Sequence, residues 1–161
     1  MTIESFQLPY SESAVRDLRE RLARTRWPDT IPGSGWEYGF DLEYLQRICR
    51  YWCEKFDWEA EIRGLGGLRH FRYIAGGQSI HFVHERGREP AAIPILLLHG
   101  WPGSFLEMLK LLPLLTDPVA HGGEPDDSFD VIVASLPGFG FSSRPTEHGM
   151  NTARMADLFA C

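Results

Sequence analysis

Two almost continuous apolar segments, IPILLL at residues 93–98 and FDVIVA at residues 129–134, most constrain what this chain can fold into. Strands with one face in water alternate apolar and polar residues, so segments without alternation are expected to be strands covered on both faces. A helical pattern follows each segment, at residues 104–115 and 151–161. This alternation predicts a doubly wound α/β architecture in which the two strands are parallel and the first one is central.

The sequence before residue 68 has a different period. Residues 11–25 and 41–58 space their apolar side chains as amphipathic helices do, and each begins at a capping side chain: Ser11 or Ser13 for the first, and Asp41 for the second. In the first helix, acidic residues stand four positions before arginines, which predicts a solvated, self-neutralised face. We therefore expect a helical region over residues 1–67 and the first part of an α/β core over residues 68–161.

Residues 70–86 contain two strand-like runs around Gly76 and Gly77, the pattern of a β-hairpin. His81 and His84 are three positions apart, so an extended strand directs them to opposite faces of the sheet. They cannot share a metal ion through that strand. We interpret both as ordinary strand residues.

The composition excludes several classes of function. The formal net charge is −6, whereas nucleic-acid binding needs a basic face. No stretch reaches the roughly 18 apolar residues of a membrane span, and the start MTIESFQLPY lacks the features of a secretory signal. An odd number of cysteines without such a signal predicts reduced thiols and a cytoplasmic location. Cys49 and Cys53 are expected to be buried thiols, and with Cys161 they complete no zinc-binding pattern.

Both apolar strands end in unusual turns, HGWPGS at residues 99–104 and the segment PGFGFSSRP. Ligands bind at the carboxyl ends of strands in open α/β sheets, which is where both turns are expected to lie. In the first turn, Gly100 and Gly103 permit backbone angles that a Cβ would forbid. Pro102 restricts the residue before it, Trp101, and can hold a cis peptide bond.

A capping box, formed by Ser104 and Glu107, is expected to start a helix directly after this turn, with its positive end facing the same spot. Such a loop would be rigid and would point backbone N–H groups at an anion, as an oxyanion hole does. The local pattern alone fits a purely structural turn equally well.

Two stretches, LLLHGWPGSFLEML at residues 96–109 and FDVIVASLPGFGFS at residues 129–142, resemble the α/β-hydrolase epoxide hydrolases, in particular the branch related to the microsomal enzyme. The front half is similar to the N-terminal domain of that branch in three stretches: RLARTRWPD, WEYGFDLEYLQRICRYWCEKFDW and IHFVHER. The resemblance covers nearly the whole chain. Dehalogenases share the HGxP element, whereas RLARTRWPD is specific to the branch.

The resemblance implies a soluble enzyme that uses water to open epoxides to vicinal diols, with no cofactor and no metal. An aspartate attacks the epoxide carbon and forms an ester, two lid tyrosines protonate the leaving oxygen, and a histidine oriented by an acidic residue activates water. In that scheme the backbone N–H of Trp101 matches the oxyanion donor. The loop would be shaped by His99, Gly100, Pro102 and Gly103. His99 is not expected to be the base, because the family's base comes later in the chain.

The nucleophile of this family stands in a Gly-x-Asp-x-Gly turn, and no aspartate of the chain has both glycines. We therefore expect residues 1–161 to stop before the nucleophile, lid tyrosines and base histidine, and to be inactive alone. The alternatives are another α/β-hydrolase, such as a haloalkane dehalogenase, and a non-catalytic remnant that acts as a binding or oligomerisation module. The expected partners are a small epoxide, water, and either a second copy of the chain or the remainder of the core. An open sheet edge and apolar surface should make the isolated chain aggregate.

Overall fold

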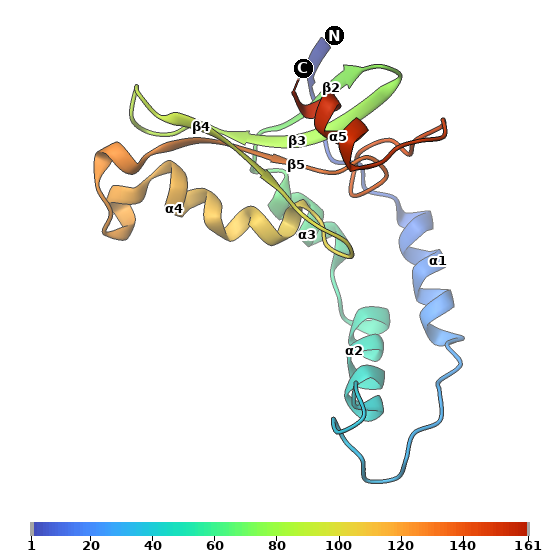
Figure 1. Cartoon of the computed structure of the whole chain (residues 1–161). Coiled ribbons are helices and arrows are strands. Elements are labelled where there is room, and N and C mark those ends of the chain that lie inside the picture. The colour runs from blue at the N-terminus through green and yellow to red at the C-terminus, as the bar shows by residue number, and fades with distance from the viewer. Residues whose placement is uncertain (1, 161) are drawn as a thin grey trace. The chain divides into compact units, whose positions relative to one another are not determined.

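A computed structural model describes residues 2–160 (Figure 1). The chain divides into two compact units, which are described separately. One unit holds the segment up to Leu8 together with the segment from Leu65 onward, and the other spans Pro9–Gly64. Across the described part of the chain, every helix is too short or too polar to cross a lipid bilayer.

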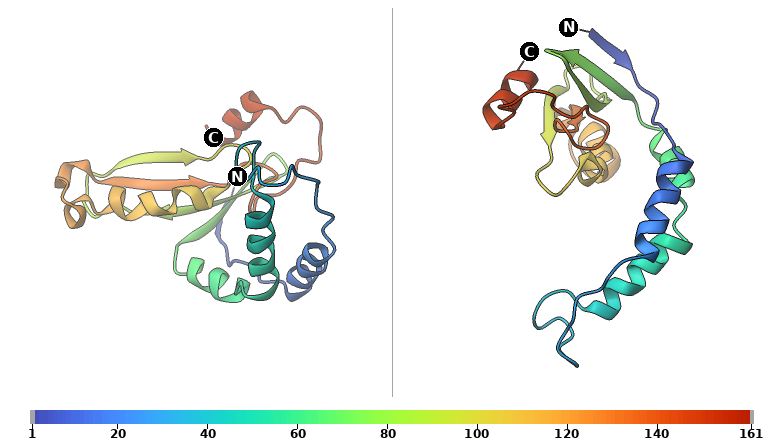
Figure 2. Two further views of the ribbon diagram at one scale, coloured as in Figure 1. Left: turned by 90° about the horizontal axis from the view of Figure 1, so that it is seen from below. Right: turned by 90° about the vertical axis from the view of Figure 1, so that its right-hand side faces the viewer.

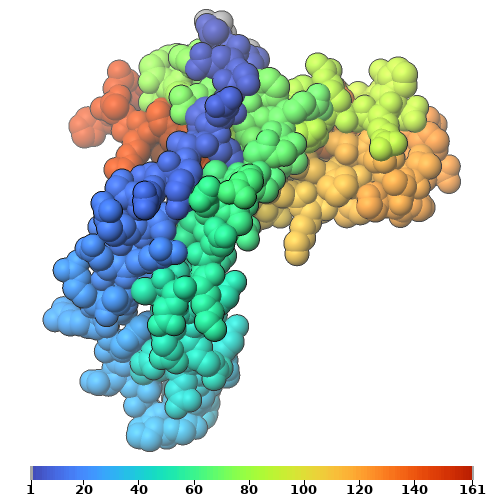
Figure 3. Space-filling model, turned by 180° about the vertical axis from the view of Figure 1, so that it is seen from behind, coloured from blue at the N-terminus to red at the C-terminus, as the bar shows by residue number. Residues whose placement is uncertain are grey.

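The unit Pro9–Gly64 contains the two helices that the sequence predicts, α1 (Glu12–Ala23) and α2 (Leu42–Glu54). Their capping side chains are Ser11, which accepts from the Ala14 N–H, and Asp41. The two helices lie side by side (Figures 2 and 3). On α1, two of the predicted acid–arginine pairs are ion pairs: Asp17 with Arg21 at 3.1 Å, and Glu20 with Arg24 at 3.7 Å.

The helix predicted over residues 41–58 is too long, because α2 ends at Glu54 and a new helix, α3 (Trp58–Leu65), follows. Asp57 causes this restart, since its carboxylate accepts a 3.0 Å hydrogen bond from the Ala60 N–H. Cys49 and Cys53 are free thiols, but they are only partly buried, whereas buried thiols were predicted. Cys161 lies outside the described residues.

Replacing Asp41 by alanine should lower the free energy of unfolding by about 1 kcal/mol, because the Tyr44 N–H loses its carboxylate acceptor at 2.7 Å. Urea denaturation followed by circular dichroism measures this loss. Asp41→Asn keeps a side-chain oxygen and is the matched control. An equal loss in both variants would contradict the capping role.

The other unit is built on a five-stranded sheet in the order β1-β2-β3-β5-β4. The strands are β1 (Thr2–Ser5), β2 (His70–Ala75), β3 (Gln78–Glu85), β4 (Ile93–Leu98) and β5 (Phe129–Ala134). β4 and β5 are parallel and the other pairs are antiparallel. The predicted hairpin is confirmed: Gly76 and Gly77 have φ values of 54° and 74°, which a two-residue turn between twisted strands requires.

Two strands differ from the prediction. Residues 2–5 form β1, which pairs with β2, although residues 1–67 were expected to be helical. β4 lies at the edge of the sheet and is not central, because β5 inserts between β3 and β4. Among residues 2–160 no strand pairs with the outer side of β4, and Ile93, Leu96 and Leu98 are exposed. The expected open sheet edge is therefore present, and aggregation of the isolated chain stays a prediction.

The main core lies on one face of the sheet. Val83, Val131 and Val133 are fully buried there against the 3₁₀ helix η1 (Phe105–Leu111) and the short helix α4 (Leu112–Thr116). The opposite face carries a groove of about 330 Å³, whose lining includes Leu158 and Phe159. These two residues belong to α5 (Thr152–Phe159), the helix predicted from residue 151, which Figure 1 labels. The alternation of side chains along β5 therefore gives the sheet one well-packed face and one partly open face.

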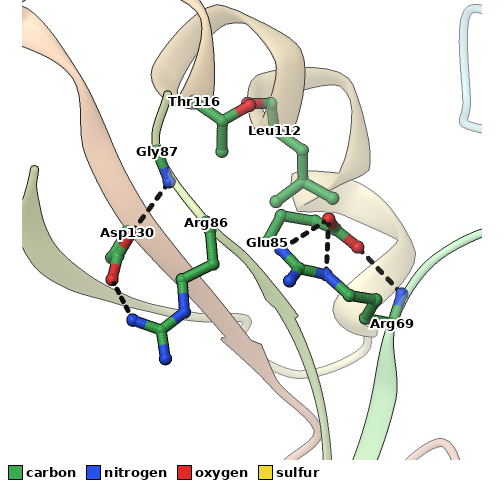
Figure 4. Close-up of polar contacts among 7 residues, drawn as sticks. All are labelled: Arg69, Glu85, Arg86, Gly87, Leu112, Thr116 and Asp130. Atoms are coloured by element: carbon green, nitrogen blue, oxygen red, sulfur yellow. Dashed lines mark hydrogen bonds and ion pairs between the residues drawn. The ribbon is translucent and has the colours of Figure 1, made fainter. Parts of the chain in front are cut away.

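Polar contacts fix the end of the sheet where β5 begins (Figure 4). The Asp130 carboxylate accepts hydrogen bonds from the Gly87 N–H at 2.8 Å and from Arg86 at 3.0 Å. These contacts hold the pKa of Asp130 below its usual range, with the Gly87 N–H as the largest cause. Glu85 accepts from the backbone N–H and the side chain of Arg69. The two unusual turns lie at the opposite end of the sheet, beyond the carboxyl end of β5.

Candidate functional site

The two unusual turns meet at one end of the sheet, beyond the carboxyl ends of β4 and β5, as predicted. β4 and β5 are parallel and in register, so their last residues, Leu98 and Ala134, lie side by side. The chain leaves β4 into HGWPGS and leaves β5 into the segment 135–143. The carboxyl ends of the two strands therefore present both turns to the same region, which is the position of ligand sites in open α/β sheets.

His99 joins the two turns. Its side chain is buried, with 5% exposed, and its Nε2 accepts the Leu136 N–H at 3.1 Å. A neutral imidazole that accepts at one nitrogen donates at the other, so Nδ1 carries the proton and donates to the Gly100 carbonyl at 3.1 Å. The ring also lies edge-on to Phe139, with 5.3 Å between the ring centroids. His99 thus connects the segment after β5 to the first turn.

The peptide between Gly100 and Trp101 is the central feature of the site. Its carbonyl oxygen accepts from His99 Nδ1 and, at 2.8 Å, from the Gly103 N–H. A planar trans peptide directs its carbonyl and its N–H in opposite directions, so fixing the oxygen also fixes where the Trp101 N–H points. Within residues 2–160 the Trp101 N–H has no hydrogen-bond acceptor, and the Trp101 side chain is 84% exposed. An oxyanion donor must be an N–H group that is held in a fixed direction and is not already hydrogen-bonded within the protein.

The glycines of this turn act differently from the prediction. Neither Gly100 nor Gly103 has a positive φ, so neither is needed for a left-handed backbone angle. At Gly103 a Cβ would overlap the carboxylate of Glu107, but this is the far end of a flexible, exposed side chain that can move aside, so space does not require glycine there. The bond between Trp101 and Pro102 is cis, as the sequence allowed.

The helix predicted directly after this turn also differs from the observed structure. Residues 105–111 form the 3₁₀ helix η1, and only Leu112–Thr116 are α-helical. Ser104 caps η1, but its hydroxyl accepts from the Leu106 N–H at 3.4 Å. The predicted capping box needs that hydroxyl to bond the N–H of Glu107, which instead donates to the Ser104 carbonyl at 3.1 Å. The tighter 3₁₀ winding changes which N–H the cap can reach.

The second turn does require glycines, because two of its residues adopt a left-handed backbone conformation. Gly138 and Gly140 have φ values of 85° and 51°. A Cβ on Gly140 would stand 2.7 Å from the Ser135 hydroxyl, so a side chain there would displace Ser135. Two serines then fasten the turn to β3, where Ser142 accepts the His81 N–H and Ser143 accepts the Ser79 N–H, both at 2.9 Å.

Sequence analysis missed a buried cluster beside these turns. His70 Nδ1 lies 2.9 Å from His81 Nε2, and His81 Nδ1 lies 2.9 Å from the Ser135 hydroxyl. Burial, and then the nearby His70 and Arg72, lower the pKa of His81 to about 3. His84, on the other face, is partly exposed. Within the described residues, no group of three or more His, Cys, Asp or Glu side chains could hold a metal ion.

Two family models match the chain. The one described as "Epoxide hydrolase N terminus" matches residues 3–108, and the one described as "alpha/beta hydrolase fold" matches residues 93–161. The second match begins at the first residue of β4 and so covers both turns.

Individual proteins are similar over almost the full chain. A Stigmatella aurantiaca protein that bears an epoxide hydrolase assignment is 47% identical over 98% of this chain. "Epoxide hydrolase 1" of the rabbit, Oryctolagus cuniculus, is 38% identical over 98%. The crystal structure of juvenile hormone epoxide hydrolase from the silkworm Bombyx mori is 33% identical over 99% of this chain and 42% of its own, with a TM-score of 0.83. The chain spans about a third, 36%, of the length of the two curated relatives.

Proposed function

The chain belongs to the epoxide hydrolase family, with the α/β-hydrolase fold, and from that premise we propose that HGWPGS supplies the oxyanion donor of an enzyme that opens epoxides to vicinal diols. One observation carries the proposal. The Gly100 carbonyl is held by two donors, so the N–H of Trp101 is directed outward, and the part of the chain that the structure describes offers it no acceptor. His99 and Gly103 supply these two donors, and Pro102 completes the loop.

The proposed reaction has two steps. A carboxylate oxygen of an aspartate bonds to an epoxide carbon, the ring C–O bond breaks, and a tyrosine hydroxyl gives its proton to the released oxygen. A histidine then takes a proton from water as the water oxygen attacks the ester carbonyl. The carbonyl oxygen becomes negatively charged in this tetrahedral intermediate, and the Trp101 N–H stabilises it by a hydrogen bond. Collapse of the intermediate breaks the bond to the diol oxygen, which takes the proton of the carboxyl group, so the diol leaves and the carboxylate is restored. The proton held by the histidine then returns to the tyrosinate, which restores both side chains.

The attacking aspartate is proposed to come from outside these residues. No aspartate or serine in the printed sequence has glycine two positions before and two positions after it, the spacing of the expected nucleophile turn. We accordingly expect no turnover by residues 1–161 alone. The comparisons favour neither a haloalkane dehalogenase nor a non-catalytic remnant.

A chimera tests the proposal. The chain replaces the matched segment of the silkworm juvenile hormone epoxide hydrolase, whose crystal structure guides the junctions. The folded chimera should convert juvenile hormone to its diol, whereas residues 1–161 alone should not. A chimera that is monodisperse and has native circular dichroism, yet forms no diol, would contradict the proposed function.

A further inference from the structure

Four groups form a hydrogen-bonded chain with a fixed direction. It starts at the Leu65 carbonyl, which can only accept, so His70 Nε2 carries a proton and donates to it at 2.9 Å. A neutral ring that donates at Nε2 accepts at Nδ1, and His81 Nε2 is then the donor of this contact. His81 in turn accepts at Nδ1, and the Ser135 hydroxyl donates to it. With both rings neutral, every proton position follows from this first acceptor.

The hydrogen-bonded chain from His70 to Ser135 lies in an apolar environment. His81 and Ser135 are completely buried, and 5% of His70 is exposed. The His81 ring packs against Phe105, with 4.9 Å between the centroids, and against Phe141, at 5.3 Å. Losing one of these hydrogen bonds would leave a buried polar group unpaired, so the arrangement is expected to hold Ser135 tightly.

His81 holds Ser135 through its backbone as well as its ring. The His81 carbonyl accepts the Ser135 N–H at 2.9 Å. The His81 N–H donates to the hydroxyl of Ser142, which itself donates to the Ser135 carbonyl at 2.7 Å. Ser135 is therefore fixed at its N–H, its carbonyl and its side chain.

Ser135 stands directly before the residue that holds His99. The Ser135 carbonyl and the Leu136 N–H belong to one peptide plane, so fixing the first orients the second. The Leu136 N–H donates to His99 Nε2, and His99 Nδ1 donates to the Gly100 carbonyl. Contacts within one unit of the fold thus run from His81 to the peptide that carries the Trp101 N–H.

We propose that His81 is a positioning residue for the oxyanion turn, because its ring fixes Ser135 and thereby the Leu136 N–H that orients His99 and the Gly100–Trp101 peptide. The proposal rests on the proposed function. It assigns a task in ester hydrolysis to a histidine whose side chain is completely buried.

Two amide variants in the chimera separate the roles of the two ring nitrogens. In His81→Asn, the amide oxygen falls near the position of Nδ1 and keeps the acceptor for Ser135. In His81→Gln, the amide nitrogen falls near the position of Nε2 and keeps the donor to His70. Both lose the ring and leave one contact broken, so a purely structural role predicts equal effects.

The expected result is a difference in one rate. His81→Gln should slow ester hydrolysis about tenfold and accumulate ester visible by mass spectrometry, with KM and the alkylation rate unchanged. His81→Asn should keep the hydrolysis rate within about threefold of the unsubstituted chimera. Equal losses in both variants, in a chimera that is otherwise active, would overturn this inference and leave the proposed function standing. An inactive unsubstituted chimera would overturn the proposed function itself.

A second measurement decides the matter if either variant fails to fold. Nitrogen NMR of the ¹⁵N-histidine-labelled chimera should show the proton on Nε2 of both His70 and His81. A proton on Nδ1 of His81 would reverse the direction of these hydrogen bonds and overturn the inference.

Discussion

Replacing His99 by leucine in the chimera should slow hydrolysis of the enzyme ester about 100-fold and leave formation of the ester nearly unchanged. Leucine fills the volume near the sheet but cannot donate to the Gly100 carbonyl or accept the Leu136 N–H. The Gly100–Trp101 peptide then loses one of its two fixed contacts. The charged oxygen forms only in the second step, so only that step should lose stabilisation.

Single-turnover mass spectrometry measures this effect, because the ester adds the mass of the epoxide to the protein. Asparagine has nearly the shape of leucine, and its amide group reaches the Nδ1 position, from which it can still donate to the Gly100 carbonyl. His99→Asn should therefore hydrolyse its ester faster than His99→Leu. Slower alkylation without accumulation of ester would contradict the role given to the Trp101 N–H.

The second large effect is a loss of stability below pH 6.5. His81 has a pKa of about 3 in the folded chain and 6.5 when unfolded. Between these values the unfolded chain binds a proton that the folded chain excludes, so stability falls as the pH falls. The slope is about 1.4 kcal/mol per pH unit, which gives about 2 kcal/mol between pH 6.5 and pH 5. Above pH 6.5 this contribution is fully present.

Urea denaturation at several pH values measures this slope, and His81→Asn is the reference because asparagine does not titrate. Burial, and then Arg86, also lower the pKa of His84, so part of the slope should remain in the variant. The difference between the two proteins isolates His81. Parallel stability curves would mean that His81 is protonated in the folded chain and that the direction assigned to the buried hydrogen bonds is wrong.

Features encoded by neighbouring residues could be predicted from the sequence. The caps at Ser11 and Asp41 and the Gly76–Gly77 hairpin depend on contacts within a few positions. The Asp57 cap is equally local, and the carboxylate directly before Trp58 is the signal that could have located the break after α2. Local patterns decide element type because caps and turns satisfy nearby backbone groups.

Features that depend on distant residues could not be predicted. An apolar run shows that a strand is covered, but not which strand lies beside it, so the edge position of β4 was missed. His81 meets Ser135 across 54 positions, through the pairing of β3 with β5. The need for glycine at position 140 has the same origin, because a Cβ there would meet the Ser135 hydroxyl, a contact that folding creates.

The central claim is that the Trp101 N–H binds the carbonyl oxygen of the ester, and a crystal structure of the chimera frozen with its ester in place tests it most directly. The account predicts a distance of about 2.7–3.1 Å from the Trp101 nitrogen to that oxygen. A Trp101 N–H that donates to another protein group, with the ester oxygen more than about 3.5 Å away, would contradict it.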